Sequence, residues 1–315
     1  CDLIEEVIRV VGYAELPETL PHAFNPTWSE PILGREDRAR DLLAAAGFVE
    51  ACTYSFVSAS ENAPFAAAVS GASPVLANAL GEPFTTMRAT PVIGLLRSAR
   101  HNVRRGQHDL ALFEVGRSYA LVDGNPVEGR RAAVLLHGSR GVHWASEPRP
   151  ADFHDGSGAV AALFAGFGAP APAFRPAALP FLAPGRSAEV VAGGTVVGWV
   201  GVLAGPLSAE WDLSEPVVAD VDLAALPVPP PPSSVEMPSR FPGSGVDLTV
   251  THPLAVSFET LASAVREGAP RELLLVDARY LWRGAGVPEG HVKTTLTVEF
   301  GSAERSLERD EINRW

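Results

Sequence analysis

Apolar residues recur at helical spacing across residues 87–106, and an apolar run typical of a strand follows directly behind them. The positions that define the apolar face are Val92, Leu95, Leu96, Ala99 and Val103. Four arginines fall largely outside that face: Arg97, Arg100, Arg104 and Arg105. This pattern predicts a helix packed on a core along one side. Gly106 can adopt the left-handed conformation that ends a helix, and Asp109–Tyr119 then reads as a nearly continuous strand.

The same reasoning predicts further elements before residue 226. Helices are expected over Asp2–Tyr13, Arg35–Ala46 and Asp152–Phe167. Strands are expected over Val49–Phe56, Pro74–Leu80, Arg131–Gly138 and Val217–Leu223. Gly193–Gly194 predicts a tight turn that joins two strands into a hairpin ending near Leu203. The first helix is expected to bury its apolar side chains, namely Leu3, Ile4, Val7, Ile8 and Val11.

A proline-rich stretch then separates two patterns. The consecutive prolines that follow Leu226 favour a stiff, extended spacer, so residues 227–239 are predicted to link two domains. Beyond this spacer the chain predicts a strand, a helix, two strands and a helix. These lie at Val246–Thr251, Phe258–Arg266, Leu273–Leu281, Thr294–Phe300 and from Leu307 onward. That order is typical of a ferredoxin-like split-βαβ domain without its last strand.

Composition narrows the functional class. A chain of 315 residues has room for two or three domains, and its net charge of −12 argues against a protein that coats nucleic acid indiscriminately. The segment from Arg240 onward is less acidic, with a net charge of −2. Two cysteines support neither a disulfide framework nor a zinc site. No apolar run is long enough to cross a bilayer, so a cytoplasmic protein without membrane or DNA partners is expected.

Two acidic groups are candidates for chemistry. Asp2, Glu5 and Glu6 share one helix face, although acids in a first turn also complement the helix dipole without any ligand. Asp152, His154 and Asp155 have the side chains of a metal or hydrolytic site. No further histidines are arranged to complete such a site, and the pattern favours a structural turn into a helix.

The central helix and strand carry a family resemblance. Leu95–Gly106 followed by Leu112–Arg117 resembles the catalytic-like module of the bacterial phenylalanine–tRNA ligase beta subunit. The resemblance implies an α+β fold over residues 21–226, with a class II aminoacyl-tRNA synthetase-like antiparallel sheet and flanking helices. Working class II sites carry an arginine before the glutamate of this strand, whereas the corresponding pair here is Phe113–Glu114. Phenylalanine cannot grip a phosphate, so the resemblance implies that the complex uses ATP while this chain does not bind it.

The first helix resembles the end of the same family's B5 domain, which would occupy residues 1–20. The resemblance implies that Asp2, Glu5 and Glu6 contribute to a Mg²⁺ site at the contact with the alpha subunit. A further aspartate of that motif is expected upstream of Cys1, so the ligand set within this sequence is incomplete.

Residues 240–315 resemble the family's ferredoxin-fold anticodon-binding domain. The matching motifs are Arg240–Pro242, Asp247–Leu248, Asp277–Tyr280, Arg283–Gly284, Gly286–Gly290 and Ser306–Asn313. The resemblance implies phosphate contacts from Arg271, Arg279, Arg283 and Lys293, with Tyr280 and Trp282 available to stack on unpaired bases. Alternatively, strand alternation buries one of the two aromatic rings and leaves the arginines as ordinary solvated charge.

Together these resemblances imply a C-terminal fragment of a beta subunit that works in an α2β2 heterotetramer. It would scaffold the catalytic alpha subunit and bind the anticodon end of tRNA(Phe) during ATP- and Mg²⁺-dependent phenylalanylation. A stand-alone RNA-binding protein on a silent synthetase fold is one alternative. An independent enzyme that uses Asp152, His154 and Asp155 is another.

Overall fold

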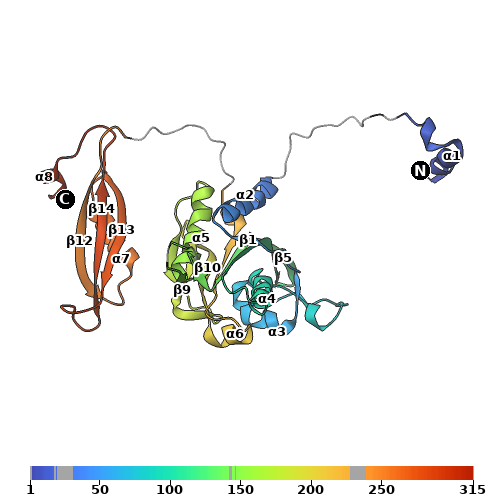
Figure 1. Ribbon diagram of the computed structural model, residues 1–315, viewed down its shortest axis with the longest axis horizontal. Helices are drawn as coiled ribbons and strands as arrows, with labels where there is room; N and C mark the ends of the chain where they lie inside the picture. Colours follow the sequence, from blue (N-terminus) through green and yellow to red (C-terminus); the bar gives the residue numbers. More distant parts are fainter. Residues whose placement is uncertain are drawn as a thin grey trace. The chain divides into compact units, whose positions relative to one another are not determined.

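The computed structural model describes residues 2–17, 19, 31–141, 144–145, 147–227 and 239–314 (Figure 1). Contacts divide the chain into two compact units, Cys1–Pro231 and Pro232–Trp315. The division falls inside the proline-rich stretch, most of which lies outside the described residues. No helix in the described residues is both long and apolar enough to cross a bilayer.

The first unit is a mixed α/β structure built on one seven-stranded sheet with the order β1-β4-β5-β11-β10-β9-β8. The strands are β1 (Val49–Glu50), β4 (Leu110–Val122), β5 (Asn125–His137), β8 (Ala173–Pro176), β9 (Leu182–Ala192), β10 (Thr195–Leu203) and β11 (Val217–Asp222). All neighbours pair antiparallel except β1, which runs parallel to β4. The sheet is therefore mixed, where the sequence predicted an antiparallel one.

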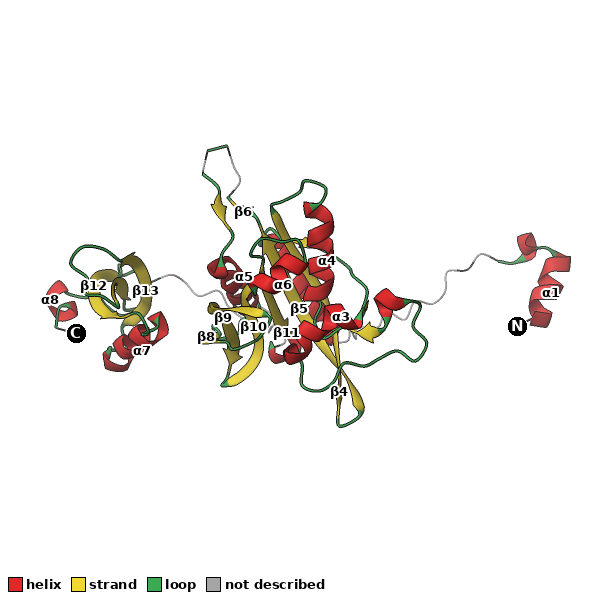
Figure 2. Ribbon diagram, turned by 90° about the horizontal axis from the view of Figure 1, so that it is seen from below, coloured by secondary structure: helices red, strands yellow, loops and turns green. Residues whose placement is uncertain are grey.

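Helices cover both faces of this sheet. On one face, α2 (Pro31–Ala45) and α5 (Phe153–Gly166) share a buried core with Phe113 and Val115 of β4. On the other face, α4 (Val92–Val103) and α6 (Gly205–Glu210) share a second core with Leu112, and Figure 2 shows these two helices on the same side of the sheet. Successive β4 residues thus enter opposite cores, as the two-residue period of a strand requires.

Turn residues define several of the predicted boundaries. Gly106 has a φ of 86° just beyond α4, which confirms its role in ending that helix. Gly193 and Gly194, with φ values of 55° and 83°, form the predicted turn between β9 and β10. A second hairpin, between β4 and β5, turns at Asp123 and Gly124, both with positive φ. The Asp-Gly pair is a strong hairpin signal, but the sequence patterns did not predict this hairpin because mainly polar residues follow the turn.

Three further sequence predictions for this unit are wrong. Pro74–Leu80 is no strand and has only an isolated bridge between Val75 and Thr86. Val49–Phe56 is not continuous, because β1 ends at Glu50 and the short β2 (Phe56–Val57) pairs instead with β3 (Thr86–Met87). The apolar side chains of α1 (Asp2–Val11) are not buried, and Leu3, for example, is 84% exposed.

Shorter elements complete the first unit. They are α3 (Ala59–Asn62), the 3-10 turns Tyr13–Glu15, Ala63–Ala68, Glu82–Phe84 and Leu223–Ala225, and the paired strands β6 (Ser139–Arg140) and β7 (Arg149–Pro150).

The second unit has the predicted order of strand, helix, two strands and helix. Its elements are β12 (Ser244–Pro253), α7 (Phe258–Gly268), β13 (Leu273–Trp282), β14 (His291–Phe300) and α8 (Arg309–Ile312). β14 lies between β12 and β13 and pairs antiparallel with both. One face of this sheet packs on α7 and α8 through Val276, Leu296 and Ile312, and the other face bears mainly polar and aromatic residues.

Candidate functional site

The family resemblance directs attention to β4, where the structure contains a buried ion pair. Arg88 Nη2 lies 2.7 Å from Glu114 Oε1, and the two residues are only 2% and 4% exposed. Thr53 Oγ1 donates a hydrogen bond of 2.6 Å to Glu114 Oε2 and accepts one of 2.8 Å from Arg88 Nη1. Arg88 Nε also donates to the carbonyl oxygen of Arg117 at 2.9 Å. The carboxylate is therefore fully engaged by protein groups.

The ion pair fills the space next to Gly116 of β4. A Cβ atom at that position would lie 2.5 Å from Arg88 Nη2 and 2.9 Å from Glu114 Oε1. No larger residue fits without displacing the ion pair.

A second buried carboxylate lies on β11. Thr90 Oγ1 donates to Asp220 Oδ2 at 2.5 Å, and Arg131 Nε donates to Asp220 Oδ1 at 2.7 Å. Thr90 stands just before α4, so this contact connects the start of that helix to the centre of the sheet.

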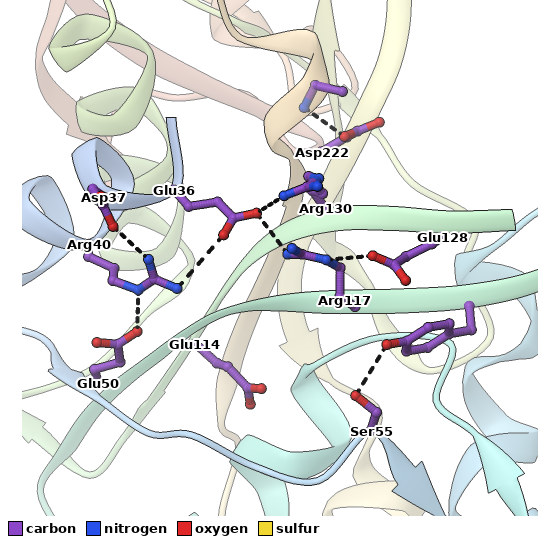
Figure 3. A network of polar contacts seen from close by, with 12 residues as sticks. Glu36, Asp37, Arg40, Glu50, Ser55, Glu114, Arg117, Glu128, Arg130 and Asp222 are labelled. Carbon is purple, nitrogen blue, oxygen red and sulfur yellow. Dashed lines mark hydrogen bonds and ion pairs between the residues drawn. The ribbon is translucent and has the colours of Figure 1, made fainter. Parts of the chain in front are cut away.

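A third ionic group joins α2 to the β4–β5 hairpin (Figure 3). Glu36 Oε1 accepts hydrogen bonds from Arg117 Nη1 at 2.8 Å and from Arg130 Nη1 at 2.5 Å. Arg40, one turn further along α2, reaches Glu50 of β1 with a hydrogen bond of 2.9 Å. Figure 3 shows these side chains as a chain of contacts between the helix and the strands.

Both side chains of the Phe113–Glu114 pair are buried. Phe113 is 1% exposed and packs in the core beneath α2 and α5. Glu114 points to the other face and is held by Arg88 and Thr53. Both side chains thus serve the packing of the sheet.

A hollow of about 700 Å³ lies further along β4, where Ser118, Ala120 and Val122 contribute to its lining. The charged side chains around it are engaged elsewhere, because Arg131 pairs with Asp220, and Glu189 pairs with Arg175 at 2.6 Å. Trp199 also lines the hollow, and its buried Nε1 has no hydrogen-bond partner among the described residues.

The group Asp152, His154 and Asp155 forms the start of α5. Asp152 is the N-cap residue and accepts hydrogen bonds from the backbone N–H groups of His154 and Asp155 at 2.8 and 3.3 Å. Asp155 accepts in return from the backbone N–H of Asp152 and receives two hydrogen bonds of 2.7 Å from Arg149. These contacts form a capping box and confirm the structural interpretation of the motif.

The candidate Mg²⁺ ligands Asp2, Glu5 and Glu6 lie on the exposed helix α1. Glu6 pairs with Arg9, one turn away on the same helix. The described residues contain no group of three or more His, Cys, Asp or Glu side chains that fits a metal ion. The role of Asp2, Glu5 and Glu6 in binding Mg²⁺ therefore stays a prediction.

In the second unit, the open face of the sheet gathers several predicted RNA-binding residues. Tyr280 and Trp282 are 57% and 42% exposed, with ring centroids 6.5 Å apart and an interplanar angle of 18°. They lie opposite Thr295 and Lys293 of β14. The expectation that alternation buries one ring is wrong, because both rings lie on the exposed face.

A β-bulge explains this placement. Ala278 pairs with Leu296 on the helix-covered face, and Arg279 is the extra residue before Tyr280 pairs with Thr295. One additional residue reverses the alternation, so Tyr280 and Trp282 turn to the open face. Arg279 forms an ion pair with Asp247 of β12.

The two remaining predicted RNA-binding residues, Arg283 and Arg271, lie at opposite ends of β13. Arg283 follows β13 in the loop that leads to β14. Arg271 precedes β13, at the opposite end of that strand from Trp282, and contacts Glu272 at 3.1 Å. The structure therefore brings Arg279, Tyr280 and Lys293 to one face, with Arg283 at its end and Arg271 apart from it.

Comparisons with known proteins connect these features to a family. A family model described as the phenylalanyl tRNA synthetase beta chain CLM domain matches residues 16–223. Proteins named phenylalanine–tRNA ligase beta subunit from Geobacillus kaustophilus and Methylococcus capsulatus are 32% and 34% identical to the chain over 99% of its length. The chain spans 39% of the length of each of these relatives. A pyrrolysyl-tRNA synthetase from Desulfitobacterium hafniense superposes with a TM-score of 0.46, at 14% identity over 61% of this chain and 66% of that one.

The family match defines the class first: the first unit is an aminoacyl-tRNA synthetase-type domain. More narrowly, the chain belongs to the phenylalanyl-tRNA synthetase beta chain family, with which it shares about a third of its residues along nearly its whole length.

The Arg88–Glu114 pair gives a first test. Arg88→Met should destabilise the chain by about 3–5 kcal/mol, because it leaves a buried carboxylate without its counter-charge. Arg88→Met/Glu114→Leu should recover much of that loss, since it removes both charges. Urea unfolding measures both effects. Arg175→Met, which breaks the exposed Arg175–Glu189 pair, is the matched control and should cost less than about 1 kcal/mol. Equal losses for the two single variants would contradict a dominant role for the buried pair.

The capping box gives a test with pH. Hydrogen bonds from Arg149 lower the pKa of Asp155, so its contribution to stability is present above the unfolded value of about 3.9 and disappears as the pH falls through the folded value. Asp155→Asn should therefore be less stable than the parent at pH 7, and the gap should shrink below about pH 4. Urea midpoints across this range measure it. Asp41→Asn, on the exposed side of α2, is the control and should show no such pH-dependent gap. A stability difference between Asp155→Asn and the parent that stays constant with pH would contradict the role assigned to Asp155.

Proposed function

We propose that the chain is the part of a phenylalanine–tRNA ligase beta subunit that supports the catalytic alpha subunit and holds the anticodon end of tRNA(Phe). The observation that carries this proposal is the similarity to beta subunits along 99% of the chain, which includes both units. The relatives' name favours this role over a stand-alone RNA-binding protein.

The helix-covered sheet supports a scaffolding role for the first unit. Its helices cover both faces near Phe113 and Glu114, and the buried Glu114 carboxylate forms an ion pair with Arg88. In this proposal the complex uses ATP at the alpha subunit, and this chain binds none. The partner would join it in an α2β2 heterotetramer in the cytoplasm. Asp2, Glu5 and Glu6, in a B5-like segment over residues 1–20, would supply part of a Mg²⁺ site completed by ligands from elsewhere.

The second unit supports the RNA-binding role. We assign it to a ferredoxin-like anticodon-binding domain over residues 240–315, because its strand order β12-β14-β13 and its helices follow the split-βαβ plan. Two exposed rings beside a lysine match the way sheet-based RNA-binding modules stack unpaired bases. Arg279 is paired with Asp247, so it would orient the face, while Lys293 and Arg283 would contact phosphates.

Co-expression with an alpha subunit tests the scaffolding role. We expect a stable complex on size-exclusion chromatography, and we expect no phenylalanine-dependent ATP–pyrophosphate exchange by this chain alone. The full-length beta subunit of the same organism serves as the positive control for assembly. Exchange activity in the isolated chain, or failure of the chain to bind an alpha subunit that the full-length control does bind, would overturn the proposal.

Substitutions in the aromatic pair test the RNA-binding role. Tyr280→Ala and Trp282→Ala should each weaken binding of a tRNA(Phe) anticodon arm by about 1–3 kcal/mol, since each removes one stacking surface. Leu274→Ala is the matched control, because Leu274 is also exposed on β13 but lies at its other end. Fluorescence anisotropy measures the affinity. Losses of the same size in all three variants would argue against a specific stacking face.

A further inference from the structure

The exposed side of α4 carries a dense group of basic side chains that none of the contacts described so far explains. Five residues, Arg97, Arg100, His101, Arg104 and Arg105, line a hollow of about 240 Å³. Their spacing places them on one side of the helix, opposite the buried face that includes Leu95 and Ala99. We call these five residues the α4 basic cluster.

Acidic neighbours neutralise only part of this cluster. Arg97 Nε donates to Glu61 Oε1 at 3.0 Å, and Arg104 forms an ion pair with Asp212. Among the described residues, no carboxylate lies within ion-pair distance of Arg100 or Arg105. Two positive charges therefore remain uncompensated on a chain whose net charge is −12.

The two uncompensated arginines are also held in place. The Arg100 guanidinium lies 4.8 Å from the centre of the buried Trp211 ring, which orients it by a cation–π contact. Arg105 Nη1 lies 3.0 Å from His101 Nδ1. A stacked guanidinium loses little mobility when it binds an anion, because its position is already restricted.

The position of these residues at a helix C-terminus explains part of the charge. Basic residues in a last turn interact favourably with the helix dipole, and this accounts for the presence of Arg100 and His101. It does not account for a hollow lined by five basic side chains, nor for the N–H donors of Arg100 that remain without an acceptor among the described residues.

We infer that the α4 basic cluster binds backbone phosphates of the tRNA, a role that rests on the function proposed above. The hollow has no apolar residue in its lining, whereas protein–protein interfaces place apolar side chains at their centre. Phosphate contacts need only charge and N–H donors, which arginine supplies in a planar fork. The cluster positions the RNA and reads no bases.

The test measures tRNA(Phe) affinity across a range of salt concentrations for the complex with its alpha subunit. Arg100→Gln/Arg105→Gln should make the slope of log K against log salt less negative by about 1.4–1.8, because each lost phosphate contact removes about 0.7–0.9. Arg100→Lys/Arg105→Lys should keep most of the slope. Arg175→Gln/Arg186→Gln removes two exposed, paired arginines elsewhere in the first unit and should leave the slope unchanged. Melting temperatures measured in parallel verify that each variant folds.

The outcomes separate this inference from the function on which it rests. Normal tRNA binding with an unchanged slope in Arg100→Gln/Arg105→Gln overturns the inference alone. An unchanged slope with loss of the alpha subunit also overturns it, and assigns the cluster to an acidic protein surface. Failure of the unsubstituted complex to bind tRNA overturns both the inference and the proposed function.

Discussion

Two opposite charges lie next to each other inside the first unit, at the point where three chain segments meet. Arg88 comes from the connection between β3 and α4, Glu114 from the middle of β4, and Thr53 from the chain between β1 and β2. Each segment supplies a partner that the other two need, because a buried charge without its counter-charge is strongly destabilising. The packing of α4 on the sheet therefore depends on this contact. The absence of a side chain at Gly116 follows from the space that the contact occupies.

Ion pairs also connect a helix to the sheet on the opposite face, where the side chains are partly exposed. Glu36 connects α2 to two neighbouring strands, and Arg40 connects it to a third. These hydrogen bonds fix α2 to β4, β5 and β1. Helices of the same chain therefore cover this sheet on both faces, as the proposed scaffolding role requires.

Sequence patterns predicted the elements whose signal is local. α4 and β4 follow from apolar periodicity, and the β9–β10 turn follows from two consecutive glycines. The buried partners of Glu114 and Asp220 were not predictable, because arginine and threonine in sequence look like exposed residues until their distant partners are known. Asp152 and Asp155 were predicted correctly, because their pattern favoured a turn into a helix and both residues stabilise the N-terminus of α5. The exposure of α1 escaped prediction because its apolar spacing predicts a covered face without indicating what covers it.

The bulge at Arg279 has a consequence for how the second unit can evolve. The residue types at positions 280 and 282 determine which side chains the open face can carry. The number of residues that precede them in β13 determines whether those side chains point to the open face or to the helix-covered face. Loss of one codon in β13 would turn both aromatic rings inward without altering either residue. In the proposed RNA-binding role, such a deletion would remove the stacking face even where both aromatic residues are kept.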